Sequence, residues 1–208
     1  MILNKKKIKA VIFDWGGVCC AEAEPFASKS LQNQLKMSPE KIIEEVRELY
    51  DDYYRGKYST EDFWYTIISH FNLKENSNIN PNNLSQAYLD SYELWPEVLE
   101  VASRLRNNYT VGLLSDLSPV MRDYIREKHN LSVVFPVQIF SCDKGINLQK
   151  KDGGKIFNMM LEKMGAQAEE TLFVDNSKNK LKVAEEVGLN ILLFENKHKF
   201  FNDIKFLL

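Results

Sequence analysis

Acidic and hydroxyl side chains stand directly after several short apolar runs of this sequence. The residues concerned are Asp14, Ser115, Asp116 and Asp175. Carboxylate oxygens are the ligands that Mg²⁺ prefers, and this ion takes only one or two protein carboxylates while it keeps several waters. If the fold brings these side chains together, they could hold a divalent cation and handle a phosphate group beside it.

A basic and glycine-rich segment, residues 144–155, lies between Asp116 and Asp175 in the chain. A lysine from this segment could neutralise the charge of a phosphoryl group. Lys150 and Lys151 are adjacent, and either could supply that charge. In a charged loop a solvated lysine is the ordinary case, so the pattern alone does not choose between them.

The apolar runs themselves are typical of strands in a parallel sheet that is covered on both faces, because they are short and lack polar alternation. The runs are Ile8–Phe13, Thr110–Leu114, Val137–Phe140, Thr171–Val174 and Asn190–Phe194. Amphipathic segments of helical length lie between most of them. This alternation predicts an α/β fold with a doubly wound, Rossmann-like parallel sheet, in which ligands bind at the carboxyl ends of the strands.

The segment between the first two predicted strands is far longer than an α/β crossover requires. Its pattern is helical: Ser38-Pro39 is a typical helix start, and apolar residues follow at helical spacing as far as Tyr53. Further helices are predicted from Ser59 and around Tyr88. We therefore expect a core domain of residues 1–18 and 96–208, with a helical cap domain of residues 19–95 inserted into it.

The composition excludes several other classes of protein. Of the 208 residues, 44% are hydrophobic and 27% are charged, which is typical of a globular chain rather than a disordered one. The net charge of −2 gives no basic excess for a nucleic-acid partner. No apolar run approaches the roughly 18 residues that cross a membrane. The three cysteines do not form a disulfide framework, so we expect a cytoplasmic protein, and nothing in the sequence indicates its oligomeric state.

The motifs together resemble the haloacid dehalogenase (HAD) superfamily, in the subgroup with a helical cap inserted after the first strand (HAD-IA-like). Four elements occur in the family's order: an aspartate after strand one, a serine after strand two, a lysine before a helix and an aspartate after strand four. The resemblance covers essentially the whole chain. It implies a HAD-like hydrolase with a doubly wound core and a substrate-selecting cap.

The resemblance also implies a role for each motif residue. Asp14 would be the nucleophile that forms an aspartyl-phosphate, and it would hold Mg²⁺ together with the backbone carbonyl of Gly16 and the side chain of Asp175. Ser115 would bind the transferring phosphoryl group. The lysine that neutralises this group is Lys151 by its spacing to the next helix, with Lys150 as a competitor because this segment is longer than usual. The other residues expected to bind substrate are Asp116, Lys150, Trp15 and Gly17.

The sequence departs from the family pattern at Gly16, where phosphatases of the family normally have a second aspartate that protonates the leaving group and then activates water. A general acid–base is worth about 10²–10⁴ in rate. We therefore expect substrates with weakly basic leaving groups, such as anomeric or acyl phosphates. Asn176 stands where another acid often follows Asp175, which predicts weaker Mg²⁺ binding.

The function expected from the resemblance is Mg²⁺-dependent hydrolysis of a small phosphomonoester, such as a sugar phosphate. Two alternatives remain. One is a 2-haloacid dehalogenase, which uses the same aspartate without metal but typically has an aromatic residue where Gly16 stands. The other is a binding or regulatory protein that kept the fold and lost catalysis, which the changes at Gly16 and Asn176 would explain.

Overall fold

A central parallel sheet organises the computed structural model, which describes residues 8–208. The five strands lie in the order β3-β2-β1-β4-β5 and all neighbours are parallel. Their bounds are β1 Ala10–Phe13, β2 Thr110–Ser115, β3 Val137–Phe140, β4 Thr171–Asp175 and β5 Asn190–Leu193. This confirms the doubly wound α/β fold; residues 1–7 of the expected core domain lie outside the described part of the chain.

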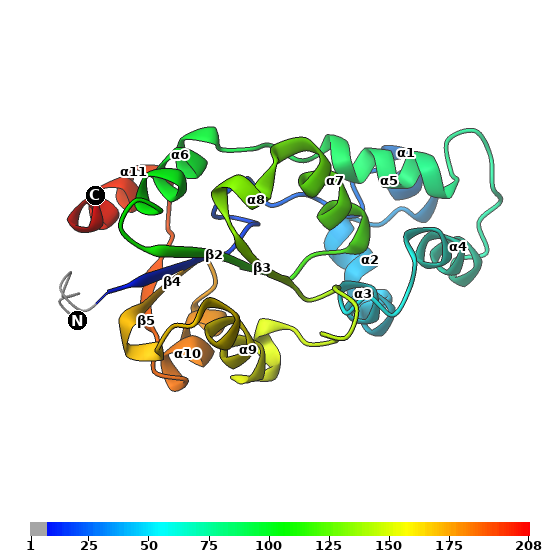
Figure 1. Cartoon of the computed structure of the whole chain (residues 1–208). Helices are drawn as coiled ribbons and strands as arrows, with labels where there is room; N and C mark the ends of the chain where they lie inside the picture. The colour runs from blue at the N-terminus through cyan, green and yellow to red at the C-terminus, as the bar shows by residue number, and fades with distance from the viewer. Residues whose placement is uncertain (1–7) are drawn as a thin grey trace.

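Helices cover both faces of the sheet, which explains why the strands lack polar alternation (Figure 1). In β1, Val11 and Phe13 pack on one face among the core helices α6, α7, α8 and α11, whereas Ala10 and Ile12 pack on the other face against α9 and α10. Successive strand residues point to opposite faces, so each run supplies two cores at once. The bounds of these helices are α6 Pro96–Leu105, α7 Pro119–His129, α8 Leu131–Val134, α9 Lys155–Met164, α10 Lys178–Glu186 and α11 Lys197–Ile204.

A group of five helices between β1 and α6 forms a helical insertion with its own apolar core, which includes Phe26, Phe63 and Trp64. The helices are α1 Lys29–Leu35, α2 Pro39–Glu45, α3 Arg47–Tyr54, α4 Thr60–His70 and α5 Pro81–Asp90. The single helix predicted from Ser38 to Tyr53 is wrong, since α2 and α3 meet at Val46, whose φ of −110° leaves helical geometry. Figure 1 shows the insertion at the carboxyl end of the sheet.

Serine side chains begin several of the helices that follow the strands. The Ser118 hydroxyl accepts a hydrogen bond from the Met121 backbone N–H at the start of α7, and Ser177 does the same for Lys180 in α10. Such caps satisfy N–H groups that a helix end leaves without partners. They fix where α7 and α10 begin, and therefore which of their residues face the end of the sheet.

Candidate active site

The nucleophile expected from the sequence, Asp14, lies at the carboxyl end of the central strand β1. Its side chain is only 2% exposed. Its Oδ1 atom accepts hydrogen bonds from the Ser115 hydroxyl at 2.6 Å and from the Trp15 backbone N–H at 2.8 Å. Ser115 ends β2, which pairs directly with β1, so the sheet register brings these two side chains together.

Lys150, not Lys151, reaches this carboxylate. Lys150 is completely buried, and its Nζ lies 2.6 Å from Asp14 Oδ2. The Lys151 side chain is 51% exposed and instead pairs with Asp51 of the helical insertion at 2.6 Å. The two lysines begin a short 3₁₀ turn, Lys150–Asp152, in which one residue of offset turns the side chains in different directions. The spacing to the next helix predicts that Lys151 reaches Asp14. In the structure Lys150 contacts Asp14 instead, and Lys151 does not.

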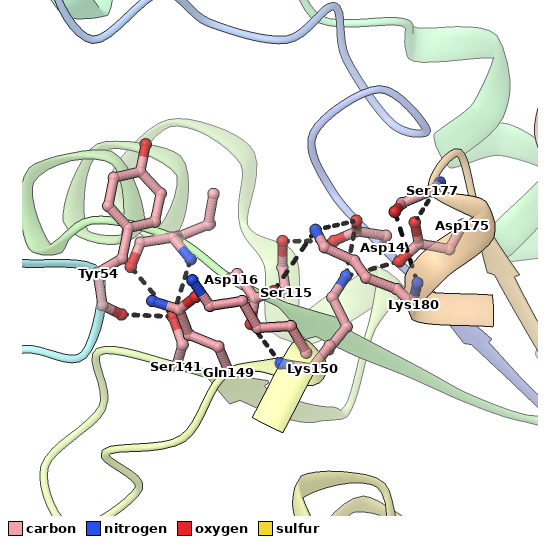
Figure 2. A network of polar contacts seen from close by, with 12 residues as sticks. Asp14, Tyr54, Ser115, Asp116, Ser141, Gln149, Lys150, Asp175, Ser177 and Lys180 are labelled. Carbon is pink, nitrogen blue, oxygen red and sulfur yellow. Dashed lines mark hydrogen bonds and ion pairs between the residues drawn. The ribbon is translucent and has the colours of Figure 1, made fainter. Parts of the chain in front are cut away.

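Asp175 completes a buried row of charges across the ends of β1 and β4 (Figure 2). The Lys150 ammonium lies 2.8 Å from Asp175 Oδ2 and therefore bridges the two aspartates. The other oxygen of Asp175 accepts a hydrogen bond from the Ser177 backbone N–H at 2.7 Å. Asp14, Ser115 and Asp175, which are far apart in the sequence, thus meet at one edge of the sheet as the sequence predicted.

A second lysine, Lys180, enters the site and was not found by sequence reasoning. Its Nζ lies 3.8 Å from Asp14 Oδ2 and 3.4 Å from Asp116 Oδ2. Asp116 also accepts a hydrogen bond from the Lys150 backbone N–H at 3.0 Å, so this carboxylate positions both lysines. The signal that could have found Lys180 is Ser177, because a helix that this residue caps places the side chain three residues later beside the end of β4.

Charge and burial set the protonation of these groups. Burial raises the pKa of Asp14, but the charges of Lys150 and Lys180 outweigh it and lower this pKa to about 2. Burial raises the pKa of Asp175 to about 6, against the opposing charge of Lys150 and with help from Asp14. Burial lowers the pKa of Lys180, yet the neighbouring carboxylates dominate and hold it above its usual value. Asp14 is therefore an ionised carboxylate held between cations.

The loop after Asp14 leaves room beside the carboxylate. A Cβ atom built on Gly16 would meet no atom within 4 Å, so the position of the missing second aspartate is open space. Gly17 adopts a φ of +73°, and a Cβ there would collide with the side chain of Asn176. The glycine therefore serves the turn rather than the substrate, since Gly17 itself does not line the cavity above Asp14. Trp15 does line it, although its side chain is buried.

That cavity has a volume of about 300 Å³ and lies between the sheet edge and the helical insertion. Asp14, Gly16, Ser115, Asp116 and Lys180 line it from the core. Tyrosines line it from the insertion and from the segment that follows; they are Tyr50, Tyr54, Tyr88 and Tyr92. Lys151 and Asp51, which form an ion pair with each other, also line the cavity. A cavity of this size suits a small molecule.

Two carboxylates and one backbone carbonyl are the donors that a metal ion could use here: Asp14, Asp175 and the carbonyl of Gly16. No group of three or more His, Cys, Asp or Glu side chains suited to a metal occurs within residues 8–208. Mg²⁺ needs only one or two protein carboxylates. Of the two here, Asp14 lines the cavity, whereas Asp175 is fully buried and contacts Lys150 and Ser177.

The sheet order, with a buried aspartate at the end of its central strand, defines the class of the protein as an α/β protein with a Rossmann-like core. The chain belongs to the haloacid dehalogenase-like hydrolases, because the model of that family matches residues 8–188. No curated protein shows a significant match to the sequence. Within residues 8–208, no helix is both long and apolar enough to cross a membrane.

Solved structures with the same fold include a HAD family enzyme from Bacteroides thetaiotaomicron, with 18% identity and a TM-score of 0.78 over 93% of this chain and 98% of that one. The same enzyme in complex with magnesium and inorganic phosphate has 20% identity and a TM-score of 0.77, over 93% and 99% of the chains. A predicted HAD-like family hydrolase from Porphyromonas gingivalis has 22% identity and a TM-score of 0.78, over 96% and 97%. At these identities the likeness establishes the fold.

Proposed function

We propose that this protein is a Mg²⁺-dependent phosphatase that hydrolyses a small phosphomonoester through an aspartyl-phosphate on Asp14. The observation that carries the proposal is the ionised Asp14 carboxylate, which lines the cavity beneath the helical insertion and lies between two lysines and a serine hydroxyl. The magnesium and phosphate bound by the enzyme from Bacteroides thetaiotaomicron support it.

Asp14 attacks the phosphorus atom with a carboxylate oxygen, the bond from phosphorus to the ester oxygen breaks, and the alcohol leaves as its alkoxide or takes a proton from water. Water then attacks the acyl-phosphate and regenerates the carboxylate with release of inorganic phosphate. A pKa of about 2 keeps Asp14 ionised at neutral pH, as a nucleophile must be. The same low basicity makes this carboxylate a good leaving group in the second step.

Positive charge around the phosphoryl group comes from Lys150 and Lys180, which both contact Asp14. We assign the phosphate-neutralising role to Lys150, since Lys151 is engaged by Asp51. Ser115 donates to Asp14 in the resting site and is placed to donate to a phosphoryl oxygen instead. Bound Mg²⁺, held by Asp14, Asp175 and the Gly16 carbonyl, would supply further electrostatic stabilisation of the phosphoryl charge.

The helical insertion acts as the cap of this site in the proposed mechanism. The Ser141 hydroxyl donates to the Tyr54 carbonyl at 2.6 Å, and the Gln149 side chain donates to the Asp51 carbonyl at 3.2 Å. These contacts hold the end of α3 against the loop that carries Lys150. Closure of the insertion over the cavity would exclude water and select a small phosphorylated metabolite by the shape of its alcohol.

The competing function is a binding protein without turnover, which the open space at Gly16 favours because no general acid stands there. Phosphate release from p-nitrophenyl phosphate and a panel of sugar phosphates, with and without Mg²⁺, separates the two functions. Metal-dependent release that disappears in Asp14→Asn is the expected result. Mg²⁺ and phosphate binding without release from any ester would overturn the phosphatase and leave the binding protein.

A further inference from the structure

The charges that line the cavity are distributed unevenly, and this distribution bears on which alcohol the substrate carries. Both lysines of the lining are already paired: Lys151 with Asp51, and Lys180 with Asp116 and Asp14. In the described part of the chain, no further lysine or arginine lines the cavity. A second anionic group on the substrate, beyond the phosphate, would therefore find no unpaired cation.

One carboxylate of the lining, Glu22, has no cationic partner among residues 8–208. Its Oε1 atom accepts a hydrogen bond of 2.9 Å from the amide of Asn176, which is the contact that the structure gives it. Glu22 follows the β1 loop, and it lines the same cavity as Tyr50. The part of the lining beside the β1 loop and Asn176 thus carries negative charge without a cationic partner among the described residues.

Tyrosines form another part of the lining. Tyr54 and Tyr88 share a hydrogen bond of 3.0 Å between their hydroxyl groups, and both pKa values are raised by burial, so the hydroxyls stay neutral. Tyr50 packs against Tyr54 with ring centroids 4.6 Å apart. Aromatic rings attract cations through their quadrupole, and rings beside a carboxylate are a typical site for an alkylammonium group.

We propose that the cavity selects a phosphomonoester whose alcohol carries an ammonium group, with the phosphate at Asp14 and the ammonium between Glu22 and the tyrosines. This inference rests on the proposed function for turnover, but not for binding. A β-ammonium group also lowers the basicity of the leaving alkoxide, which suits a site that has no acid at Gly16. That second effect acts on turnover alone, so affinity is the quantity that tests the site.

The test compares phosphocholine with two other phosphate esters. In 3,3-dimethylbutyl phosphate a carbon atom replaces the quaternary nitrogen and the shape is kept, and 3-(phosphonooxy)propionate carries a carboxylate instead of the cation. Calorimetric dissociation constants are measured in Mg²⁺ with Asp14→Asn, in which the proposed nucleophile is removed so that the ligands are not hydrolysed during the titration. We expect phosphocholine to bind about tenfold more tightly than its neutral isostere and the anion to bind most weakly. Equal affinity for phosphocholine and the isostere would overturn the proposal.

Glu22→Gln provides the second arm, and Glu93→Gln, an exposed acid outside the cavity lining, is its matched control. The preference for phosphocholine should fall toward unity in Glu22→Gln and persist in Glu93→Gln; persistence in both would overturn the role of Glu22. Turnover of p-nitrophenyl phosphate by the unmodified protein is scored separately. If p-nitrophenyl phosphate is not hydrolysed but phosphocholine is preferred, the phosphatase proposal is refuted and the ammonium site is supported. If p-nitrophenyl phosphate is hydrolysed but phosphocholine is not preferred, the phosphatase proposal is supported and the ammonium site is refuted.

Discussion

Lys150 and Asp175 form an ion pair of 2.8 Å in which neither side chain is exposed to solvent. The same ammonium lies 2.6 Å from Asp14, so this one cation pairs with two buried carboxylates on adjacent strands, and Lys180 approaches Asp14 less closely, at 3.8 Å. Removal of one partner of a buried pair is strongly destabilising because it leaves charge without compensation in a medium of low dielectric constant. The stability of the site and its chemistry therefore depend on the same side chain.

Lys150→Met should destabilise the protein by about 3–5 kcal/mol, measured by urea unfolding, because two buried carboxylates then face each other. Phosphatase turnover should fall by about 100-fold or more, as for the loss of one preorganised group that stabilises charge. Lys151→Gln breaks only the half-exposed pair with Asp51 and should change the free energy of unfolding by less than about 1 kcal/mol. Equal losses in the two variants would contradict the assignment of Lys150.

The sheet and most of the site could be predicted because both depend on local patterns. Each apolar run ends at a polar residue, and parallel strands bring their carboxyl ends to one edge, so Asp14, Ser115 and Asp175 had to converge once the fold was known. The choice between Lys150 and Lys151 depends on a short 3₁₀ turn whose phase no periodicity reveals. Lys180 lies on a polar helix surface, where a lysine is ordinary.

The position of Gly16 provides the second prediction. Its φ is not in the left-handed region and a Cβ atom has open space, so Gly16→Asp should fold with little change in stability. The new carboxyl group supplies the missing general acid, and turnover of alkyl phosphates should rise relative to aryl phosphates by about 10-fold or more. The ratio of kcat/KM for an alkyl and an aryl phosphate is the measurement.

Gly16→Asn is the matched control for that prediction, because asparagine has the same shape and cannot donate a carboxyl proton. Gly16→Asn should have the same ratio of kcat/KM for an alkyl and an aryl phosphate as the unmodified protein. If Gly16→Asp leaves this ratio unchanged as well, then the glycine does not set the preference for weakly basic leaving groups.

Arg55 links the helical insertion to the loop that carries Lys150, and its loss provides the third prediction. Its guanidinium donates to both carboxylate oxygens of Asp152, one of them at 2.8 Å, and to the carbonyl of Asn147. Arg55→Ala should lower the free energy of unfolding by only about 1 kcal/mol, because Arg55 and Asp152 are both partly exposed. KM should rise severalfold more than kcat falls, since the insertion closes less often over the cavity.

Lys57→Ala is the matched control for Arg55, because Lys57 pairs at 2.7 Å with Asp52 inside the helical insertion and does not reach the core. Amide hydrogen exchange of α3 and of residues 149–152 reports on the contact directly. Faster exchange in both segments is expected for Arg55→Ala and not for Lys57→Ala. Unchanged exchange and unchanged KM in Arg55→Ala would show that the pair does not hold the insertion in place.

His129 predicts a pH dependence of stability. Its Nε2 atom lies 3.0 Å from the Tyr92 hydroxyl, and its ring packs near Trp15 with centroids 6.0 Å apart. Burial, and then the charge of Lys128, lower the pKa of His129 below 6.5. Between the lowered folded value and 6.5 the unfolded chain binds more protons, so this contribution is fully present above about pH 6.5 and is lost as the pH falls toward the folded pKa.

The contribution of His129 to stability should therefore decrease as the pH falls below about 6.5, whereas Asp175, whose pKa is raised to about 6, stabilises the folded protein as the pH falls through that value. The urea midpoint of the unmodified protein should accordingly fall relative to that of His129→Gln as the pH is lowered below about 6.5. His198→Gln is the comparison for the loss of one histidine, because His198 is exposed on α11 and lies away from the cavity. Glutamine keeps a polar group near Tyr92 and removes the charge, which separates titration from packing. If the urea midpoint depends on pH in the same way in His129→Gln and in the unmodified protein, protonation of His129 does not oppose folding.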